Sequence, residues 1–197
     1  MSPRDAGDHA GRVTPALRDA CRILVAGASG SGKTTLAARI GAALGLPHVE
    51  IDRLHWHAGW TPNPGFEQEV AALAAQERWI TEWQYSSARP LLAARADLLI
   101  WLDLPRRTVL SRVVTRTLRR RLLRVELWHG DQEPPLRSFF SDPDHIVRWS
   151  MSTWSLYPDR VREALRARPD LRLVRLRSDR DVRRLLRLLG AEHTFAR

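Results

Sequence analysis

The residues whose types and spacing most clearly indicate chemistry lie at 27–35, which read GASGSGKTT. Gly27, Gly32, Lys33 and Thr34 match the spacing G-x-x-x-x-G-K-[ST], the Walker A pattern of a phosphate-binding loop. In such a loop backbone N–H groups surround the phosphates, the lysine reaches the β- and γ-phosphates, and the threonine hydroxyl ligates Mg²⁺. Lys33 is the only lysine among 32 lysines and arginines, so the other 31 are arginine. Because the planar guanidinium of arginine holds a different geometry, phosphate binding explains this one exception.

The sequence on either side of the loop supports the same interpretation. Residues 21–27, CRILVAG, form a short apolar run that predicts a buried strand, and residues 34–46 carry apolar side chains at helical spacing. This order directs the helix N-terminus at the phosphate. We therefore expect ATP and Mg²⁺ as cofactors, with ATP bound by the whole loop: Gly27, Ala28, Ser29, Gly30, Ser31, Gly32, Lys33, Thr34 and Thr35.

The rest of the chain alternates strand and helix patterns, which predicts an α/β fold with three layers and a mostly parallel five-stranded sheet. A disordered arm is expected at 1–20 and a single domain at 21–197. The last helix is expected to be capped by Ser178 or Asp179. Further strands are predicted at 47–52, 78–85, 97–105 and 171–178, and helices at 65–77, 88–96, 106–127, 145–168 (interrupted at Pro158) and 179–190.

Composition narrows the class of protein. A length of 197 residues suits one domain, and the single cysteine, Cys21, excludes an internal disulfide. No apolar run reaches the length of a membrane span, and the first residues lack the apolar stretch of a secretory signal. We expect a cytoplasmic protein without a membrane partner. The net charge of +10 favours anionic partners such as nucleotides or nucleic acid.

Three further segments carry a family resemblance: LPHVEIDRLHWHAGW, RWITEWQY and LLIWLDLPRRTVLSRVVTRTLRR. Together with the loop, they resemble the P-loop kinases of the nucleotide-kinase group, and most closely the adenylate-kinase-like topology modulation proteins, over roughly residues 21–190. The resemblance implies the strand order 2-3-1-4-5 and a lid-like insertion around 119–142. It also implies a phosphotransferase that acts on a nucleotide or a small hydroxyl-bearing metabolite.

The same resemblance suggests which carboxylate lies near Mg²⁺. Relatives show W-[VI]-[IV]-D-G-N-Y at the end of the third strand, where this chain reads WITEWQY. Glu82 therefore takes the aspartate place, Trp83 the glycine place and Gln84 the asparagine place. Asp103 is the alternative, because it follows the apolar run LLIWL as a Walker B aspartate would. A third interpretation leaves both as ordinary carboxylates at strand ends.

Asp52 is expected to end the second strand. Small-molecule kinases on this fold often carry an acceptor-binding carboxylate there, which would orient an acceptor hydroxyl and take its proton. The alternative is a cap for the following turn. His55 and His57 lie two residues apart with no third ligand nearby, which favours aromatic packing over a metal site. Four tryptophans are expected around the acceptor pocket, with core packing as the alternative: Trp56, Trp60, Trp79 and Trp83.

The stretch 106–124 is rich in arginine and has no acidic residue. Arg112 and Arg116 share one helical face, opposite an apolar stripe. By the resemblance, these two arginines would clamp the transferring γ-phosphate; the alternative is a solvated face. The stripe is predicted to contain Leu110, Val113, Val114, Leu118 and Leu122.

Two other functions remain open. The arginine-rich helix would suit a nucleic-acid-associated ATPase, in which it binds a phosphate backbone. The departure at Glu82 and Trp83 would suit a sensor that binds a nucleotide without transferring phosphate.

Overall fold

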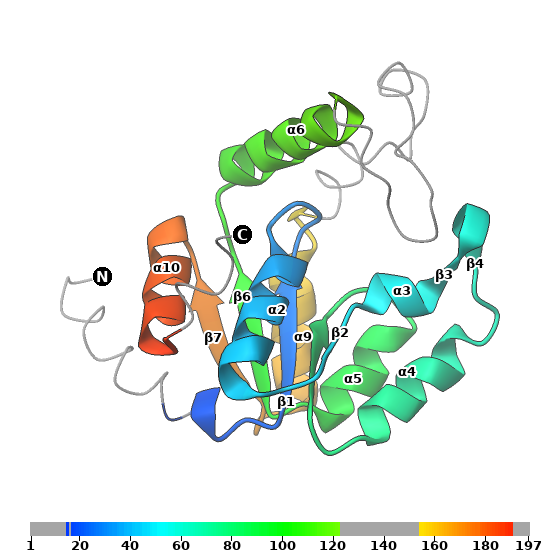
Figure 1. The fold of residues 1–197 in the computed structure, drawn as a ribbon. Helices are drawn as coiled ribbons and strands as arrows, with labels where there is room; N and C mark the ends of the chain where they lie inside the picture. The colour runs from blue at the N-terminus through cyan, green and yellow to red at the C-terminus, as the bar shows by residue number, and fades with distance from the viewer. Residues whose placement is uncertain (1–14, 16, 123–153, 191–197) are drawn as a thin grey trace.

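The computed structural model describes residue 15 and residues 17–122 and 154–190, with the backbone alone described for 116–122. A parallel sheet forms its centre, and helices flank the sheet (Figure 1). The sheet strands are β1 (Arg22–Gly27), β2 (His48–Val49), β5 (Trp79–Glu82), β6 (Leu98–Leu102) and β7 (Arg172–Leu176). The helices are α2 (Lys33–Leu44), α3 (Ile51–His55), α4 (Phe66–Ala75), α5 (Ala88–Arg95), α6 (Arg106–Leu122), α9 (Tyr157–Ala167) and α10 (Asp179–Leu188).

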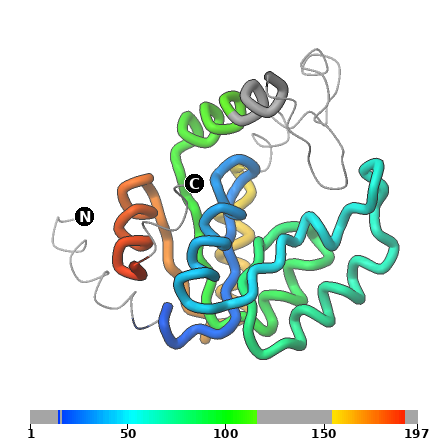
Figure 2. The backbone as a smooth tube through the Cα atoms, in the orientation of Figure 1, coloured from blue at the N-terminus to red at the C-terminus, as the bar shows by residue number. Residues whose placement is uncertain are grey.

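The order of the sheet is β2-β5-β1-β6-β7, and every neighbouring pair is parallel. Numbered as five core strands, this is 2-3-1-4-5, so the expected α/β class and strand order are confirmed. A small antiparallel pair, β3 (Trp56–His57) and β4 (Thr61–Pro62), was not predicted. These two short strands are joined by a 3₁₀ turn at Ala58–Trp60 and lie at the edge of the molecule (Figure 2).

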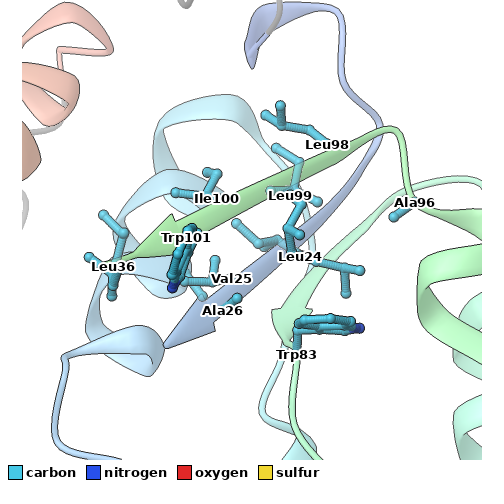
Figure 3. Packing of buried hydrophobic residues seen from close by; sticks show 14 of the residues in the cluster. Leu24, Val25, Ala26, Leu36, Trp83, Ala96, Leu98, Leu99, Ile100 and Trp101 are labelled. Carbon is cyan, nitrogen blue, oxygen red and sulfur yellow. The ribbon is translucent and has the colours of Figure 1, made fainter. Parts of the chain in front are cut away.

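The core is built on the two central strands. All five residues of β6 are buried, as are the last five of β1, which is the pattern of strands covered on both faces. Leu24, Val25, Leu99 and Ile100 pack together there, with Leu36 of α2 beside them (Figure 3). Because parallel strands end at the same edge, this core brings the loop after β1 beside the ends of β5 and β6.

The predicted second strand is wrong in extent. The strand covers only His48–Val49, and Asp52 lies in the first turn of α3 instead of at a strand end. The physical cause is a side chain on the neighbouring strand: the carboxylate of Glu82 accepts a hydrogen bond from the backbone N–H of Ile51 at 3.0 Å. That contact fixes the start of the helix.

The arginine-rich helix, α6, buries a different face from the one predicted. Among the residues of α6 whose side chains are described, 106–115, Val109 and Val113 are buried, whereas Leu110 and Val114 are 36% and 41% exposed. The predicted stripe is therefore wrong at these two positions, because the helix directs its Val109–Val113 side at the loop after β1. The side chains of Leu118 and Leu122 lie outside the described residues, as does the expected insertion beyond residue 122.

The remaining boundaries follow local chemistry. Pro158, the predicted interruption, occupies the first turn of α9, where proline is well tolerated. Ser178 caps α10 by accepting a hydrogen bond from the Asp181 N–H, as expected.

The N-terminal arm predicted at 1–20 is part of the fold at its end. Leu17 and Ala20 are buried in the core, while 1–14 lie outside the described residues. Among the helices of the described ranges, none is long and apolar enough to cross a bilayer.

Candidate active site

The loop between β1 and α2 has a backbone that requires glycine. Gly30 and Gly32 have φ angles of 79° and 97°, in the left-handed region that L side chains rarely adopt. At Gly27, whose φ is 152°, a Cβ would lie 2.6 Å from Ser31 Oγ. These three glycines therefore allow the backbone of the loop to turn tightly.

Several polar groups of this loop suit a phosphate ligand. Gly32, the N-cap of α2, provides no side-chain hydrogen bond to the helix N-terminus. Ser31 is 1% exposed, and its hydroxyl has no hydrogen-bond partner in the part of the chain described. Lys33 is 8% exposed, and its Nζ donates to the carbonyl of Ala28 at 3.2 Å. A polyphosphate would supply the oxygens that these donors need, so the residues present fit the expected ATP.

Asp52 lies within the electrostatic field of this loop. Its Oδ1 accepts hydrogen bonds from Gln84 Nε2 at 2.5 Å and from the Tyr85 hydroxyl at 2.6 Å. Burial raises the pKa of Asp52, although the Tyr85 hydrogen bond and the charge of Lys33 oppose the rise. Tyr85 has a φ of 60°, a strained value for an aromatic residue, and this conformation accompanies its contact with Asp52.

Glu82 is fully engaged at the end of β5. It is 1% exposed, and its two oxygens contact His48 Nε2 at 3.1 Å and the Ile51 N–H at 3.0 Å. Burial opposes its ionisation, but these hydrogen bonds outweigh burial and lower the pKa of Glu82. Glu82 therefore holds α3, and with it Asp52, beside the end of β5. Its role next to Mg²⁺ stays a prediction.

The alternative carboxylate, Asp103, belongs to an ion pair. Its Oδ2 accepts hydrogen bonds from Arg175 Nε at 2.8 Å and Nη2 at 2.5 Å. The Arg175 guanidinium also lies 4.5 Å above the ring of Trp101. Asp103 thus links β6 to β7, and its role at Mg²⁺ likewise remains a prediction.

Helix α6 packs directly on the loop between β1 and α2. Arg112 Nη1 donates to the carbonyl of Ser31 at 2.7 Å, and its Nη2 forms an ion pair with Asp179 of α10. A Cβ added to Gly30 would lie 2.1 Å from Val113 Cγ2, which shows how closely the helix approaches. The structure therefore places Arg112 at the loop, while the side chain of Arg116 lies outside the described residues.

Aromatic side chains gather beside Asp52. The ring of His55 stacks on Tyr85 with centroids 3.9 Å apart, and Trp56 Nε1 donates to the Tyr85 hydroxyl at 3.2 Å. Trp60 meets Trp56 edge to face and is 37% exposed. His55 thus packs among aromatic rings, as favoured from the sequence.

Two aromatic residues of this region differ from the sequence interpretation. Trp79 is opposite Arg22 at the amino end of β5, fully buried, so its predicted place at the acceptor pocket is wrong. Tyr85 was not identified as a functional residue, although it occupies the tyrosine place of the W-[VI]-[IV]-D-G-N-Y pattern. This match to the pattern was the signal from which Tyr85 could have been identified.

Comparison with known proteins connects this geometry to a fold. No protein-family model matches the chain, and no curated protein sequence matches it. The shikimate kinase of Acinetobacter baumannii, solved with shikimate, has a TM-score of 0.52 at 16% identity, over 92% of this chain and 99% of that chain.

A gluconokinase and a sugar kinase are also similar in structure. A gluconokinase from Sinorhizobium meliloti 1021 has a TM-score of 0.48 at 20% identity, over 86% of this chain and 91% of its own. A sugar kinase from Janibacter sp. HTCC2649 has a TM-score of 0.43 at 20% identity, over 87% and 95%. The match to shikimate kinase, with its TM-score of 0.52, shows that the chain has the P-loop, nucleotide-kinase-like fold of that enzyme.

Proposed function

We propose that this chain is an ATP- and Mg²⁺-dependent phosphotransferase whose acceptor is a hydroxyl group of a nucleotide or a small metabolite. One observation carries the proposal: the only lysine of the chain lies in a phosphate-binding loop, and a half-buried carboxylate, Asp52, lies within reach of its charge. In the proposed function, the phosphate-binding loop and the proton acceptor belong to one site. The shared kinase fold supports the same reaction class.

The loop residues would hold the phosphates of ATP, from Gly27 to Thr35. The hydroxyl of Thr34, with Glu82 or Asp103 nearby in the sheet, would hold Mg²⁺, directly or through water. When bound, Mg²⁺ neutralises charge on the phosphates during transfer. Within the described residues there is no group of three metal-binding side chains. That fits Mg²⁺, which takes most of its ligands from water and phosphate.

Asp52 would act as the proton acceptor. The acceptor oxygen forms a bond to the γ-phosphorus as the bond to the β–γ bridging oxygen breaks, and the hydroxyl proton passes to the carboxylate. Gln84 and Tyr85 both bind Oδ1, so we assign the acceptor hydroxyl to Oδ2. A carboxylate whose pKa is raised by burial is a better base at neutral pH than an exposed one.

Arg112 and Arg116 would neutralise charge on the transferring group. Arg112 already contacts the loop at the Ser31 carbonyl. Because its other nitrogen is paired with Asp179, we expect it to orient the loop as well as the phosphate.

The test is transfer of label from γ-labelled ATP to a metabolite pool. We expect Lys33→Ala to lower transfer by about a thousandfold or more, with an unchanged far-UV circular dichroism spectrum. Lys33→Arg is the matched control, since it keeps the charge and changes the geometry, and it should also lose most transfer. Full transfer by Lys33→Ala would refute the assignment. Tight ATP binding without transfer to any acceptor would favour the sensor function.

A nucleic-acid-associated ATPase is the second candidate, favoured by the net charge of +10 and by the exposed Arg106 and Arg107 at the start of α6. It predicts binding to duplex or single-stranded nucleic acid that weakens steeply with salt, by about one unit of log–log slope per phosphate contact. Binding that is absent at moderate salt would dismiss this candidate.

A further inference from the structure

Trp56 connects the proposed base, Asp52, to the β3–β4 hairpin through one tyrosine. Trp56 is the first residue of β3, which follows α3 directly (Figure 1), and its indole Nε1 donates to the Tyr85 hydroxyl at 3.2 Å. The Tyr85 hydroxyl in turn donates to Asp52 Oδ1 at 2.6 Å. The backbone N–H of Trp56 also donates to the carbonyl of Asp52 and closes the last turn of α3. Trp56 therefore reaches Asp52 by two routes, one through the backbone and one through Tyr85.

The direction of these hydrogen bonds follows from what each group can donate or accept. An indole N–H only donates, and an ionised carboxylate only accepts. The Tyr85 oxygen must therefore accept from Trp56 and give its own proton to Asp52. Gln84 Nε2 donates to the same oxygen, Oδ1, at 2.5 Å. Two donors thus hold Oδ1, whereas no hydrogen bond from the described residues holds Oδ2.

Ring contacts and a second anchor hold Trp56 and Tyr85 in place. Tyr85 stacks on His55 with centroids 3.9 Å apart and meets Phe66 edge to face at 5.2 Å. The far end of the hairpin is tied back to α3 by Asn63, whose backbone N–H donates to the His55 carbonyl at 2.8 Å. The hairpin is therefore attached to α3 at both of its ends, and Trp56 lies at one of them.

We propose that Trp56 is a positioning residue: its indole N–H turns the Tyr85 hydroxyl towards Asp52 Oδ1, so that Oδ2 is left to receive the proton of the acceptor. This inference rests on the proposed function for the role of Asp52 as the base. The acceptor oxygen bonds to the γ-phosphorus as the bond to the β–γ bridging oxygen breaks, and the hydroxyl proton moves to Oδ2. Oδ1 keeps both of its hydrogen bonds throughout, so the network does not have to rearrange during transfer.

Charged and titratable groups from several elements also act on Asp52, and an informative substitution must leave them unchanged. They are Lys33 of α2, Glu50 and His55 on either side along the chain, Glu82 and Tyr85 at the end of β5, and Tyr157 of α9, which donates to the Trp83 carbonyl at 3.4 Å. Burial lowers the pKa of His55, so the ring that stacks on Tyr85 is neutral at neutral pH. Exchanging Trp56 for phenylalanine removes an N–H donor and alters none of these charges.

The test follows the side-chain carboxyl carbon of Asp52 by ¹³C NMR during a pH titration of the nucleotide-free protein. The signal is assigned as the one that is missing from Asp52→Asn. In Trp56→Phe, Tyr85 donates less strongly to the carboxylate, so we expect the titration midpoint to rise by about 0.3–0.7 pH unit. Trp154→Phe is the matched control, because it removes an indole hydrogen bond to the Leu104 carbonyl that involves neither Tyr85 nor Asp52. It should leave the midpoint unchanged.

A double variant separates the hydrogen bond from a general loss of packing. Tyr85→Phe removes the hydroxyl through which Trp56 acts, so adding Trp56→Phe to it should give no further shift. The proposal is overturned if Trp56→Phe alone leaves the midpoint at its wild-type value, or if its shift is equally large in the Tyr85→Phe protein. Thermal unfolding shows whether each variant keeps the fold. Should the phenylalanine variant not fold, Trp56→Met removes the same donor with a more adaptable side chain.

The titration is independent of the proposed function, so the two can fail separately. If label transfer from ATP survives in Asp52→Asn, the role of Asp52 as the base fails, although a shift in Trp56→Phe would still show that Trp56 orients its partner. If transfer is lost in Asp52→Asn but Trp56→Phe leaves the titration unchanged, the positioning role alone fails. A shift together with that loss of transfer supports both.

Discussion

The two edges of the parallel sheet differ in how their charged side chains are paired. At the amino edge, where β1, β6 and β7 begin, Arg22, Asp97 and Arg172 line a polar depression of about 530 Å³ together with Arg168 and Asp170. At the carboxyl edge lie the glycine-rich loop after β1, Asp52 and Arg89. Both edges are rich in arginine and aspartate, so composition alone does not separate them.

Asp97 and Arg168 at the amino edge each have a charged partner. Asp97 accepts from Arg22 Nη2 at 2.9 Å and from the backbone N–H groups of Arg22 and Cys21. Arg168 pairs with Asp170 at 2.6 Å and donates to carbonyls at the end of α5, including Ala93 at 3.0 Å. Burial opposes the ionisation of Asp97, but its hydrogen bonds outweigh burial and lower its pKa. The hydrogen bond from Arg168 lowers the pKa of Asp170 to about 2.

At the carboxyl edge Arg112 and Asp103 have charged partners too, but other polar groups there are held at an energetic cost. Burial raises the pKa of Asp52 and lowers the pKa of Arg89, and the Ser31 hydroxyl lacks a partner in the described part of the chain. The lesson is that a large depression is weak support for an active site. Groups held at an energetic cost are the stronger indication, because folding alone does not explain them.

The largest expected difference between the edges is in phosphate transfer. Asp52→Asn should lower label transfer by about a hundredfold to ten-thousandfold, because the proton acceptor is lost. Its stability should be unchanged or raised, since a carboxylate whose pKa burial raises is costly to keep charged at neutral pH. Asp97→Asn is the matched variant at the amino edge and should keep transfer. Equal losses of transfer in both variants would contradict the proposed difference between the two edges of the sheet.

The next largest effect concerns the loop itself. Gly30→Ala would place a Cβ 2.1 Å from Val113 Cγ2 and force alanine into a left-handed backbone. We expect a stability loss of about 1–3 kcal/mol and a loss of nucleotide binding, measured by thermal unfolding and ADP titration. At Gly45, whose φ is +63° and where a Cβ would have nothing within 4 Å, alanine should cost about 1 kcal/mol and leave ADP affinity intact. Unchanged ADP affinity in Gly30→Ala would contradict the tight packing of α6 on the loop.

A stability measurement tests whether the charge pairing at the amino edge stabilises the fold. Asp97→Asn should lower the free energy of unfolding by about 1–3 kcal/mol at neutral pH, because it removes a charged acceptor from Arg22. Since folding lowers the pKa of Asp97 from its ordinary value of 3.8, its stabilisation is present above that value and is lost as pH falls through the folded pKa. Below about pH 4, the free energy of unfolding should therefore change less steeply with pH in the variant than in the wild type. Parallel curves would show that Asp97 is not stabilising.

The smallest expected effect is a change in pH dependence. Tyr85→Phe removes a hydrogen bond that favours the ionised form of Asp52, so the pKa of that carboxyl rises further. The acidic limb of the kcat/KM profile should move to higher pH, with a loss of about tenfold or less at acidic pH and recovery at alkaline pH. A uniform loss at every pH would mean that Tyr85 acts on the acceptor instead.

The sequence predicted the parts of this molecule that depend on neighbours along the chain. The loop follows from the spacing of Gly27, Gly32 and Lys33, and the sheet from apolar runs separated by helical periods. Leu110 and Val114 were misplaced because helical spacing gives a relative face but not the direction in which packing turns it. The contact of Tyr157 with Trp83 was not foreseen because 74 residues separate them along the chain. The helix that begins beside Asp52 depends on Glu82, thirty-one residues after Ile51.

Lys33 has a practical consequence beyond its place in the loop. It is the only lysine of the chain, so apart from the α-amino group an acylating reagent selective for amines has one target, and that target is 8% exposed. The rate of modification would report directly on occupancy: a nucleotide seated over this amine should shield it. Mass spectrometry of unaltered protein could then rank candidate triphosphates by the protection that each one gives.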